Sequence, residues 1–168
     1  MKFILSLLLV AGATAAHAHP LWTKANSGMS VEDVQAAFPN GVITPPGTGS
    51  LYSGAILKYR LENVDVQGSP FQANFYFNAD GLEQVALSSR TKEDTTLCTA
   101  RYTQLHSALS GKYGTPVNIR KFEPDFGQKE STFSQGDLAI VTSVYPLSRG
   151  CSIDINYKSN KTGSSSNL

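Results

Sequence analysis

Two histidines are the residues of this sequence best suited to metal chemistry. His19 would begin the chain if a leader were removed after Ala18, and an amino-terminal histidine offers both its amine and its imidazole to one metal ion. A copper site of this kind needs a second imidazole, and His106 is the one other histidine beyond Ala18. His106 lies at the edge of the apolar stripe of a predicted helix, where histidines usually serve packing. A small copper-binding protein that uses His19, with His106, is therefore an alternative hypothesis.

Carboxylate pairs are the other candidates for chemistry, and each has a structural explanation. Glu93 and Asp94 lie where a helix is predicted to begin, a position that favours negative charge. Glu123 and Asp125 flank Pro124 in a predicted loop. The sequence has none of the motifs of a serine hydrolase elbow, a zinc protease or a phosphate-binding loop. We therefore expect no catalytic residue, no enzyme activity and no cofactor.

The two cysteines of the chain are Cys98 and Cys151. In an oxidising compartment two cysteines usually form one structural disulfide. Their separation is also far from the C-x-x-C spacing of redox-active pairs. We therefore predict a structural disulfide between Cys98 and Cys151, which leaves neither thiol free to bind a metal.

The first eighteen residues have the composition of a secretory signal peptide. Lys2 supplies a positive charge, residues 3–16 are almost wholly apolar, and Ala16-His17-Ala18 is a small-x-small cleavage signal. We expect cleavage between Ala18 and His19, with release to the periplasm or the outside of the cell. Later apolar runs are shorter than the roughly 18 residues that span a bilayer, so we expect no membrane anchor.

The charge balance narrows the class of partner. Without Lys2, the 14 Lys and Arg residues become 13, which equals the 13 Asp and Glu residues. A neutral chain lacks the basic excess that nucleic acids and anionic membranes attract. We therefore expect no nucleic-acid partner. Residues 19–158 are predicted to form one α+β domain, and residues 159–168 a flexible tail.

Helical and strand patterns alternate along this domain. Ser30 and Asp33 form a capping-box pattern at the start of a short helix. Strands are indicated where apolar and polar residues alternate with a period of two. The predicted order is a helix from residue 30, three strands within 51–89, a helix over 94–112, and strands over 117–122, 131–145 and 151–158.

This order predicts the fold class. Short turns between the strands favour an antiparallel sheet rather than the parallel sheet of alternating strands and helices. We expect an α+β fold of two tandem units, each a helix plus three antiparallel strands, with the helices packed on one sheet face. The units would span approximately residues 28–90 and 94–158.

The polar side of this predicted sheet is the candidate binding surface. If the alternation holds, one face carries six polar side chains that a purely structural strand does not require, and Tyr and Arg are frequent anchors of protein interfaces. The six residues are Lys58, Arg60, Asn74, Tyr76, Gln84 and Arg90. An ordinary solvated sheet face has the same alternation, and a structural envelope protein without a specific ligand is a second alternative.

Two short motifs add a resemblance. The Gly-Met-Ser-x-x-x-Val segment over residues 28–34, followed by Asn78-Ala79-Asp80-Gly81-Leu82, resembles units of the β-lactamase inhibitor protein family and of small outer-membrane assembly lipoproteins. The resemblance implies a helix packed on an antiparallel sheet and binding of another protein through the open sheet face. The lipoproteins carry a lipidated cysteine that this sequence lacks, and the inhibitors usually have more cysteines.

Together these features predict a secreted or periplasmic protein-binding module of the inhibitor, immunity or envelope-assembly type. It would bind another envelope or secreted protein stoichiometrically through the polar sheet face.

Overall fold

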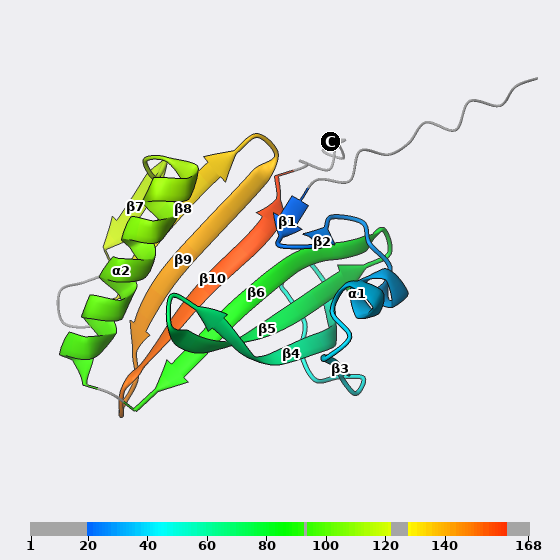
Figure 1. Ribbon diagram of the computed structural model, residues 1–168, viewed down its shortest axis with the longest axis horizontal. Helices are drawn as coiled ribbons and strands as arrows, with labels where there is room; N and C mark the ends of the chain where they lie inside the picture. Colours follow the sequence, from blue (N-terminus) through cyan, green and yellow to red (C-terminus); the bar gives the residue numbers. More distant parts are fainter. Residues whose placement is uncertain (1–19, 93, 122–127, 161–168) are drawn as a thin grey trace, which may run out of the picture.

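The strands of this protein form one large antiparallel sheet and one short ribbon (Figure 1). The structure, a computed structural model, describes residues 20–92, 94–121 and 128–160. The eight-stranded sheet has the spatial order β3 (Val42–Ile43), β4 (Ile56–Val66), β5 (Ser69–Asn78), β6 (Gly81–Thr91), β10 (Cys151–Ser159), β9 (Leu138–Pro146), β8 (Lys129–Gln135) and β7 (Asn118–Lys121). The remaining elements are the ribbon of β1 (Pro20–Trp22) and β2 (Ala25–Asn26), and the helices α1 (Val31–Ala37) and α2 (Thr95–Tyr113).

The predicted fold of two tandem helix-plus-three-strand units is wrong. Strands β6 and β10 pair without interruption from Thr91↔Cys151 to Gln84↔Lys158, so one sheet runs through both halves of the chain. Four strands, not three, follow each helix within the described residues. One cause is Gly136, whose φ of 57° makes a turn that separates β8 from β9, two strands that the sequence pattern had joined into one run.

Both helices begin where their capping residues predict. The Ser30 hydroxyl accepts a hydrogen bond from the Asp33 amide at 3.1 Å, and the Asp33 carboxylate accepts one from the Ser30 amide at 3.1 Å, which completes the capping box of α1. The Asp94 carboxylate accepts a hydrogen bond from the Leu97 amide at 2.9 Å and caps α2. Helix α2 ends at Gly114, whose φ is 83°.

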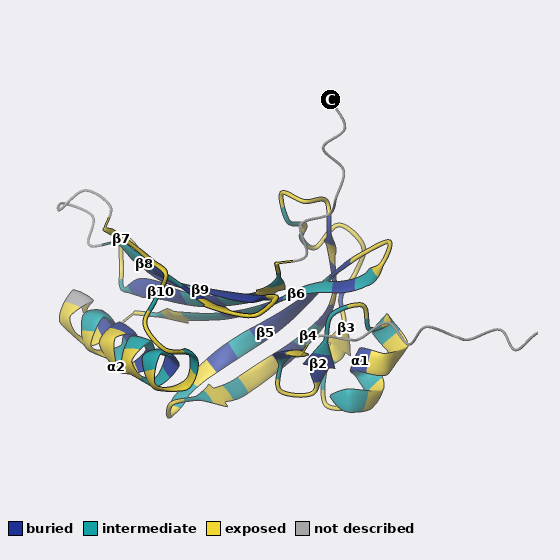
Figure 2. Ribbon diagram, turned by 90° about the horizontal axis from the view of Figure 1, so that it is seen from above, coloured by how far each residue is buried: buried dark blue, intermediate teal, exposed yellow. Residues whose placement is uncertain are grey.

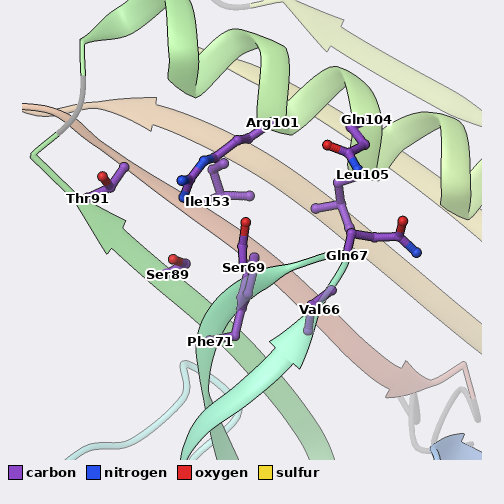
Figure 3. Close-up of a pocket in the computed structure, with 10 residues that line it drawn as sticks. All are labelled: Val66, Gln67, Ser69, Phe71, Ser89, Thr91, Arg101, Gln104, Leu105 and Ile153. Carbon is purple, nitrogen blue, oxygen red and sulfur yellow. The ribbon is translucent and has the colours of Figure 1, made fainter.

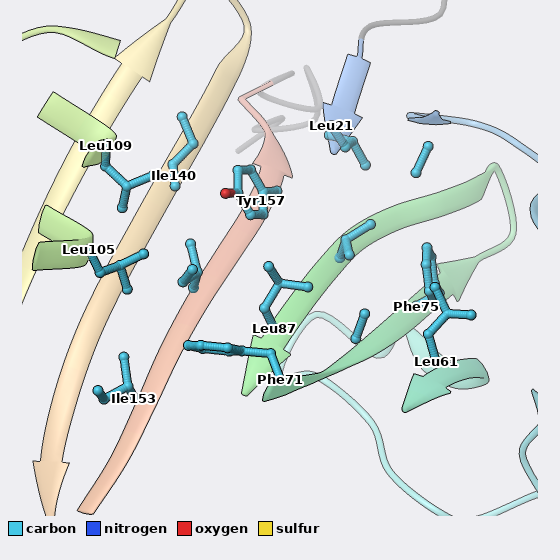
Figure 4. Packing of buried hydrophobic residues seen from close by; sticks show 14 of the residues in the cluster. Leu21, Leu61, Phe71, Phe75, Leu87, Leu105, Leu109, Ile140, Ile153 and Tyr157 are labelled. Carbon is cyan, nitrogen blue, oxygen red and sulfur yellow. The ribbon is translucent and has the colours of Figure 1, made fainter. Parts of the chain in front are cut away.

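The core lies between the sheet and the helices, because α1 and α2 cover the same sheet face (Figure 2). Alternate residues of the central strands point to this side, and Figure 4 shows Phe75, Leu87 and Ile153 among them. Trp22 joins the core by stacking on Phe38, with 5.6 Å between the ring centroids. We call this side the helix face.

A disulfide connects the first turns of α2 with the start of β10, as predicted. Cys98 and Cys151 are bonded with an S–S distance of 2.07 Å, and each residue is about 1% exposed. Such a bond fits a protein that folds in an oxidising compartment. In the part of the chain that the structure describes, no helix combines the length and the apolar character needed to cross a membrane.

Removal of the disulfide should lower stability. The bond joins residues 53 positions apart, and closing a loop of that length stabilises the folded state by about 4 kcal/mol in the chain-entropy model. We expect a Cys98→Ser, Cys151→Ser variant to unfold at lower urea concentration than the oxidised protein. Reduced wild-type protein is the matched control and should behave like the variant. Equal midpoints for the oxidised protein and the variant would contradict this account.

A second stability test concerns Thr142 on β9, which is fully buried on the helix face. Its hydroxyl has no hydrogen-bond partner among the described residues, and a buried unpaired polar group is costly. We expect Thr142→Val to raise the free energy of unfolding by about 1 kcal/mol. Thr142→Ser keeps the hydroxyl and deletes a methyl group, so it should lower stability by about 1 kcal/mol. A denaturant titration in which Thr142→Val has a lower free energy of unfolding than the wild type would overturn this interpretation.

Candidate functional site

The sheet side opposite the helices, which we call the open face, carries most of the predicted site residues. Its strands place them in register: Arg60 opposite Asn74, Tyr76 opposite Gln84, and Arg90 opposite Ser152. The open face is defined here by Arg60, Glu62, Gln72, Asn74, Tyr76, Gln84, Ala86, Ser88 and Arg90 on β4 to β6, and by Ser152, Asp154, Asn156, Val141, Ser143 and Tyr145 on β10 and β9.

Cross-strand hydrogen bonds hold several of these side chains in place. The Arg60 guanidinium Nε donates to the Asn74 side-chain oxygen at 2.9 Å, across β4 and β5. The Gln84 amide donates to the Asn156 side-chain oxygen at 3.1 Å, across the β6–β10 junction. Asn74 is only 7% exposed although it lies on the polar face. The open face is therefore an ordered polar surface with fixed side chains rather than a row of independent solvated groups.

Lys58 departs from the predicted row because β4 contains a bulge. Leu57 pairs with Tyr76 and Tyr59 with Phe75, so Lys58 is the extra residue between them. Its ammonium lies 5.9 Å from the centroid of the Phe77 ring, and Phe77 is a core residue. Five of the six predicted residues therefore share the open face, and Lys58 lies apart from them. A bulge of one residue shifts the alternation, and the sequence gives no sign of it.

Asp154 is the residue of this face that sequence reasoning did not select. It lies on β10 in register with Ser88 and Ser143. Burial raises the pKa of its carboxyl group above the ordinary value, while the Ser152 hydroxyl and the Arg90 charge act in the opposite direction. The signal in the sequence was its position between Ile153 and Ile155, the pattern of a charged residue on a strand whose other side is buried.

Tyr76 lies within the electrostatic influence of two charges on this face. Burial raises the pKa of its phenol above the ordinary value, the Arg60 charge lowers it, and the Asp154 charge raises it. The phenol therefore stays protonated at neutral pH and keeps its capacity to donate a hydrogen bond. Tyr76 therefore joins an aromatic hydroxyl to the Arg60 cation of the neighbouring strand, and the partly buried Asp154 carboxyl group lies farther along the same face.

The Gly/Pro-rich loop over residues 44–55 borders one end of the open face. Figure 1 draws this loop, in cyan, behind the strands and away from the two helices. The Leu57 amide donates to the Gly49 carbonyl at 2.9 Å, and the Ser53 hydroxyl donates to the Glu83 carboxylate of β6 at 2.6 Å. At its tip Tyr52 is fully exposed.

Of the residues considered for copper binding or acid–base chemistry, the structure describes His106 and Asp94, and Asp94 caps α2. His106 packs in the interior edge of α2, with its ring centroid 5.6 Å from that of Phe133. His19, Glu93, Glu123 and Asp125 lie outside the described residues. Among residues 20–92, 94–121 and 128–160, no three His, Cys, Asp or Glu side chains are grouped so that they could hold a metal ion.

A pocket on the helix face lies between α2 and the tip of the β4–β5 hairpin (Figure 3). Phe71, Leu105 and Ile153 line its apolar part, and all three are buried core residues. Gln67, Ser69 and other polar residues line the rest of it. The pocket is narrow and partly open to solvent. It is the entrance to the gap between the helix and the hairpin, and it lies on the opposite side of the sheet from the predicted site.

Comparisons with known proteins give no match: no family model, no curated protein and no solved structure corresponds to this chain.

The partly buried carboxyl group of Asp154 makes a testable contribution to stability. Because its folded-state pKa is raised, Asp154 favours the folded state most at pH values below its ordinary pKa of about 3.9. That contribution is lost as the pH rises through the folded-state value. We expect the stability of wild type relative to Asp154→Asn to decrease from acidic to neutral pH, as measured by urea unfolding. Parallel profiles for wild type and Asp154→Asn would contradict the prediction.

Proposed function

We propose that this protein is a secreted binding module that holds another extracytoplasmic protein against its open face. The observation that supports this most strongly is the ordered polar network there, above all the Arg60–Asn74 and Gln84–Asn156 hydrogen bonds. The proposed activity is stoichiometric occlusion of the partner, without catalysis.

Preorganisation is the physical reason why this face suits protein binding. Immobilising a long side chain at an interface costs about 0.5–1.5 kcal/mol. On the open face Arg60 and Gln84 are already held by neighbours on adjacent strands. A partner would therefore meet side chains whose conformational freedom is largely lost before binding. A sheet face whose only role was contact with water would gain no binding affinity from side chains held in fixed positions.

The chemistry of the group around Tyr76 favours a protein partner. Tyr and Arg are the side chains most enriched at the energetic centres of protein interfaces, with Trp. Tyr76 and Arg60 are each partly exposed and lie on neighbouring strands. Arg60 uses Nε for Asn74, and among the described residues its two terminal nitrogens have no hydrogen-bond partner. Such a group fits a partner surface that carries a carboxylate beside an apolar ring.

The location proposed for this activity is the periplasm or the exterior of the cell. The Cys98–Cys151 disulfide is consistent with that location. The signal-peptide pattern of residues 1–18 and the cleavage site before His19 support export. The motifs that resemble β-lactamase inhibitors and assembly lipoproteins point to the same class of binding protein.

The proposal is tested by affinity capture from extracytoplasmic extract of the source organism, followed by titration of the purified retained protein. We expect one partner to bind the wild type and to bind Arg60→Ala, Tyr76→Ala at least about tenfold more weakly, the loss typical of interface anchors. The matched control is Leu97→Ala, Lys112→Ala, which also removes one cation and one large side chain, but from α2.

The control variant should keep wild-type affinity. All three proteins should be fully folded under the conditions of the titration, although loss of the Arg60 donor to the buried Asn74 side chain should lower the unfolding midpoint of Arg60→Ala, Tyr76→Ala. Equal weakening by both double variants would contradict binding through the open face. A partner whose affinity changes only with the α2 variant would place the interface on the helix face instead.

A further inference from the structure

A second pocket lies on the helix face, between α2 and the edge of the sheet. Its space is about 490 Å³ when the open solvent at its mouth is included. Three strand residues and three helix residues supply its polar groups, and one exposed isoleucine adds an apolar wall. The lining residues are Tyr102, Thr103 and His106 of α2, Ile119 and Lys121 of β7, and Lys129 and Ser131 of β8.

Two neighbouring lysines line this pocket from the sheet side. Lys121 and Lys129 are register partners on β7 and β8, and both line the pocket. Like charges placed opposite one another across two strands are destabilising. The next pair along the same strands is Arg120 with Glu130, which has opposite charges. The lysine pair is therefore an exception to the charge complementarity of this edge, and no carboxylate is found among the described lining residues.

The pocket also offers a hydroxyl proton. The Tyr102 phenol and the Ser131 hydroxyl lie 3.1 Å apart, and both residues are buried. One hydroxyl proton is used in this hydrogen bond, so the other remains to be donated to a ligand. Burial raises the pKa of the Tyr102 phenol above its ordinary value, the bond to Ser131 lowers it, and the Glu130 charge raises it. The phenol therefore remains a donor at neutral pH.

Apolar contacts would come from Ile119 of β7 and His106 of α2. Ile119 is 56% exposed at the edge strand, and the His106 ring lies across from it on α2, 6.1 Å from the Tyr102 ring centroid. An isoleucine and an imidazole suit a flat or branched apolar body rather than a bare inorganic ion.

From this arrangement we infer that the pocket binds a small organic anion. Its oxyanion headgroup, a carboxylate or a phosphate monoester, lies between Lys121 and Lys129, and its apolar body lies against Ile119 and His106. Binding neutralises the lysine pair and uses the free hydroxyl proton of the Tyr102–Ser131 pair. This site is on the other side of the sheet from the proposed protein-binding face and does not depend on it.

The test is titration of the purified protein with benzoate and with phenyl phosphate at low ionic strength and constant chloride, followed by NMR. Acetate and inorganic phosphate are the matched probes without an aromatic ring. We expect saturable shifts at the lining residues, with the aromatic anions binding at least about tenfold more tightly than the small ones. The comparison of benzoate with phenyl phosphate identifies the preferred headgroup.

Two variants distinguish specific anion binding in this pocket from general attraction of anions to exposed lysines. Lys121→Gln, Lys129→Gln should weaken the aromatic anions at least about tenfold and, without anion, should unfold at the same or a higher temperature because the repulsion is gone. Lys24→Gln, Lys58→Gln removes two exposed lysines elsewhere and should bind like the wild type. Equal weakening by both variants, or no saturable binding, would overturn the inference.

One further variant tests the chain's own carboxylates. Glu123 and Asp125 follow Lys121 in the sequence and lie outside the described residues. Anion binding that appears only in Glu123→Gln, Asp125→Asn would show that these residues already neutralise the lysine pair, and would also overturn the inference. Binding of similar strength in this variant and in the wild type would support it.

Discussion

The pairing of β6 with β10 is the interaction on which the rest of this structure depends. These strands are distant in sequence, yet they stay in register over eight residue pairs, from Thr91 and Cys151 to Gln84 and Lys158. Their junction joins the strands that follow α1 to those that follow α2, so one sheet and one core serve both. The Cys98–Cys151 disulfide closes the same junction at one end by tying α2 to the start of β10.

This junction also divides the molecule into two surfaces with different chemistry. On the helix face, side chains such as Leu87 and Ile155 fill the core beneath α1 and α2. On the open face, the same two strands bring Gln84 to Asn156 and hold Asp154 in a partly buried position. The polar network is continuous only because β6 and β10 are neighbours. The proposed binding surface therefore forms only when strands distant in sequence pair. The side of the sheet on which each of its residues lies is set by the alternation along its own strand.

The sequence was sufficient to predict local features of the fold, but it was insufficient to predict which distant strands pair. Ser30 and Asp94 marked the helix starts because capping is decided within a few residues, and two cysteines in an exported chain left one pairing. The single sheet was missed because strand order depends on contacts between segments some seventy residues apart. The bulge at Lys58 and the partly buried Asp154 were missed for the same reason, since register and burial depend on neighbouring strands. The face shared by Arg60 and Tyr76 followed from period-two alternation alone.

The most direct test of the central claim is covalent footprinting of the protein with its captured partner, by arginine- and tyrosine-specific reagents read out by mass spectrometry. The account predicts that the partner protects Arg60, Tyr76 and Arg90 on the open face. Arg101 and Tyr113 of α2, both partly exposed and on the opposite side of the sheet, should react at the same rate with and without the partner. Unchanged reactivity at Arg60 and Tyr76 in a complex that is fully formed would contradict the claim that the open face is the binding surface.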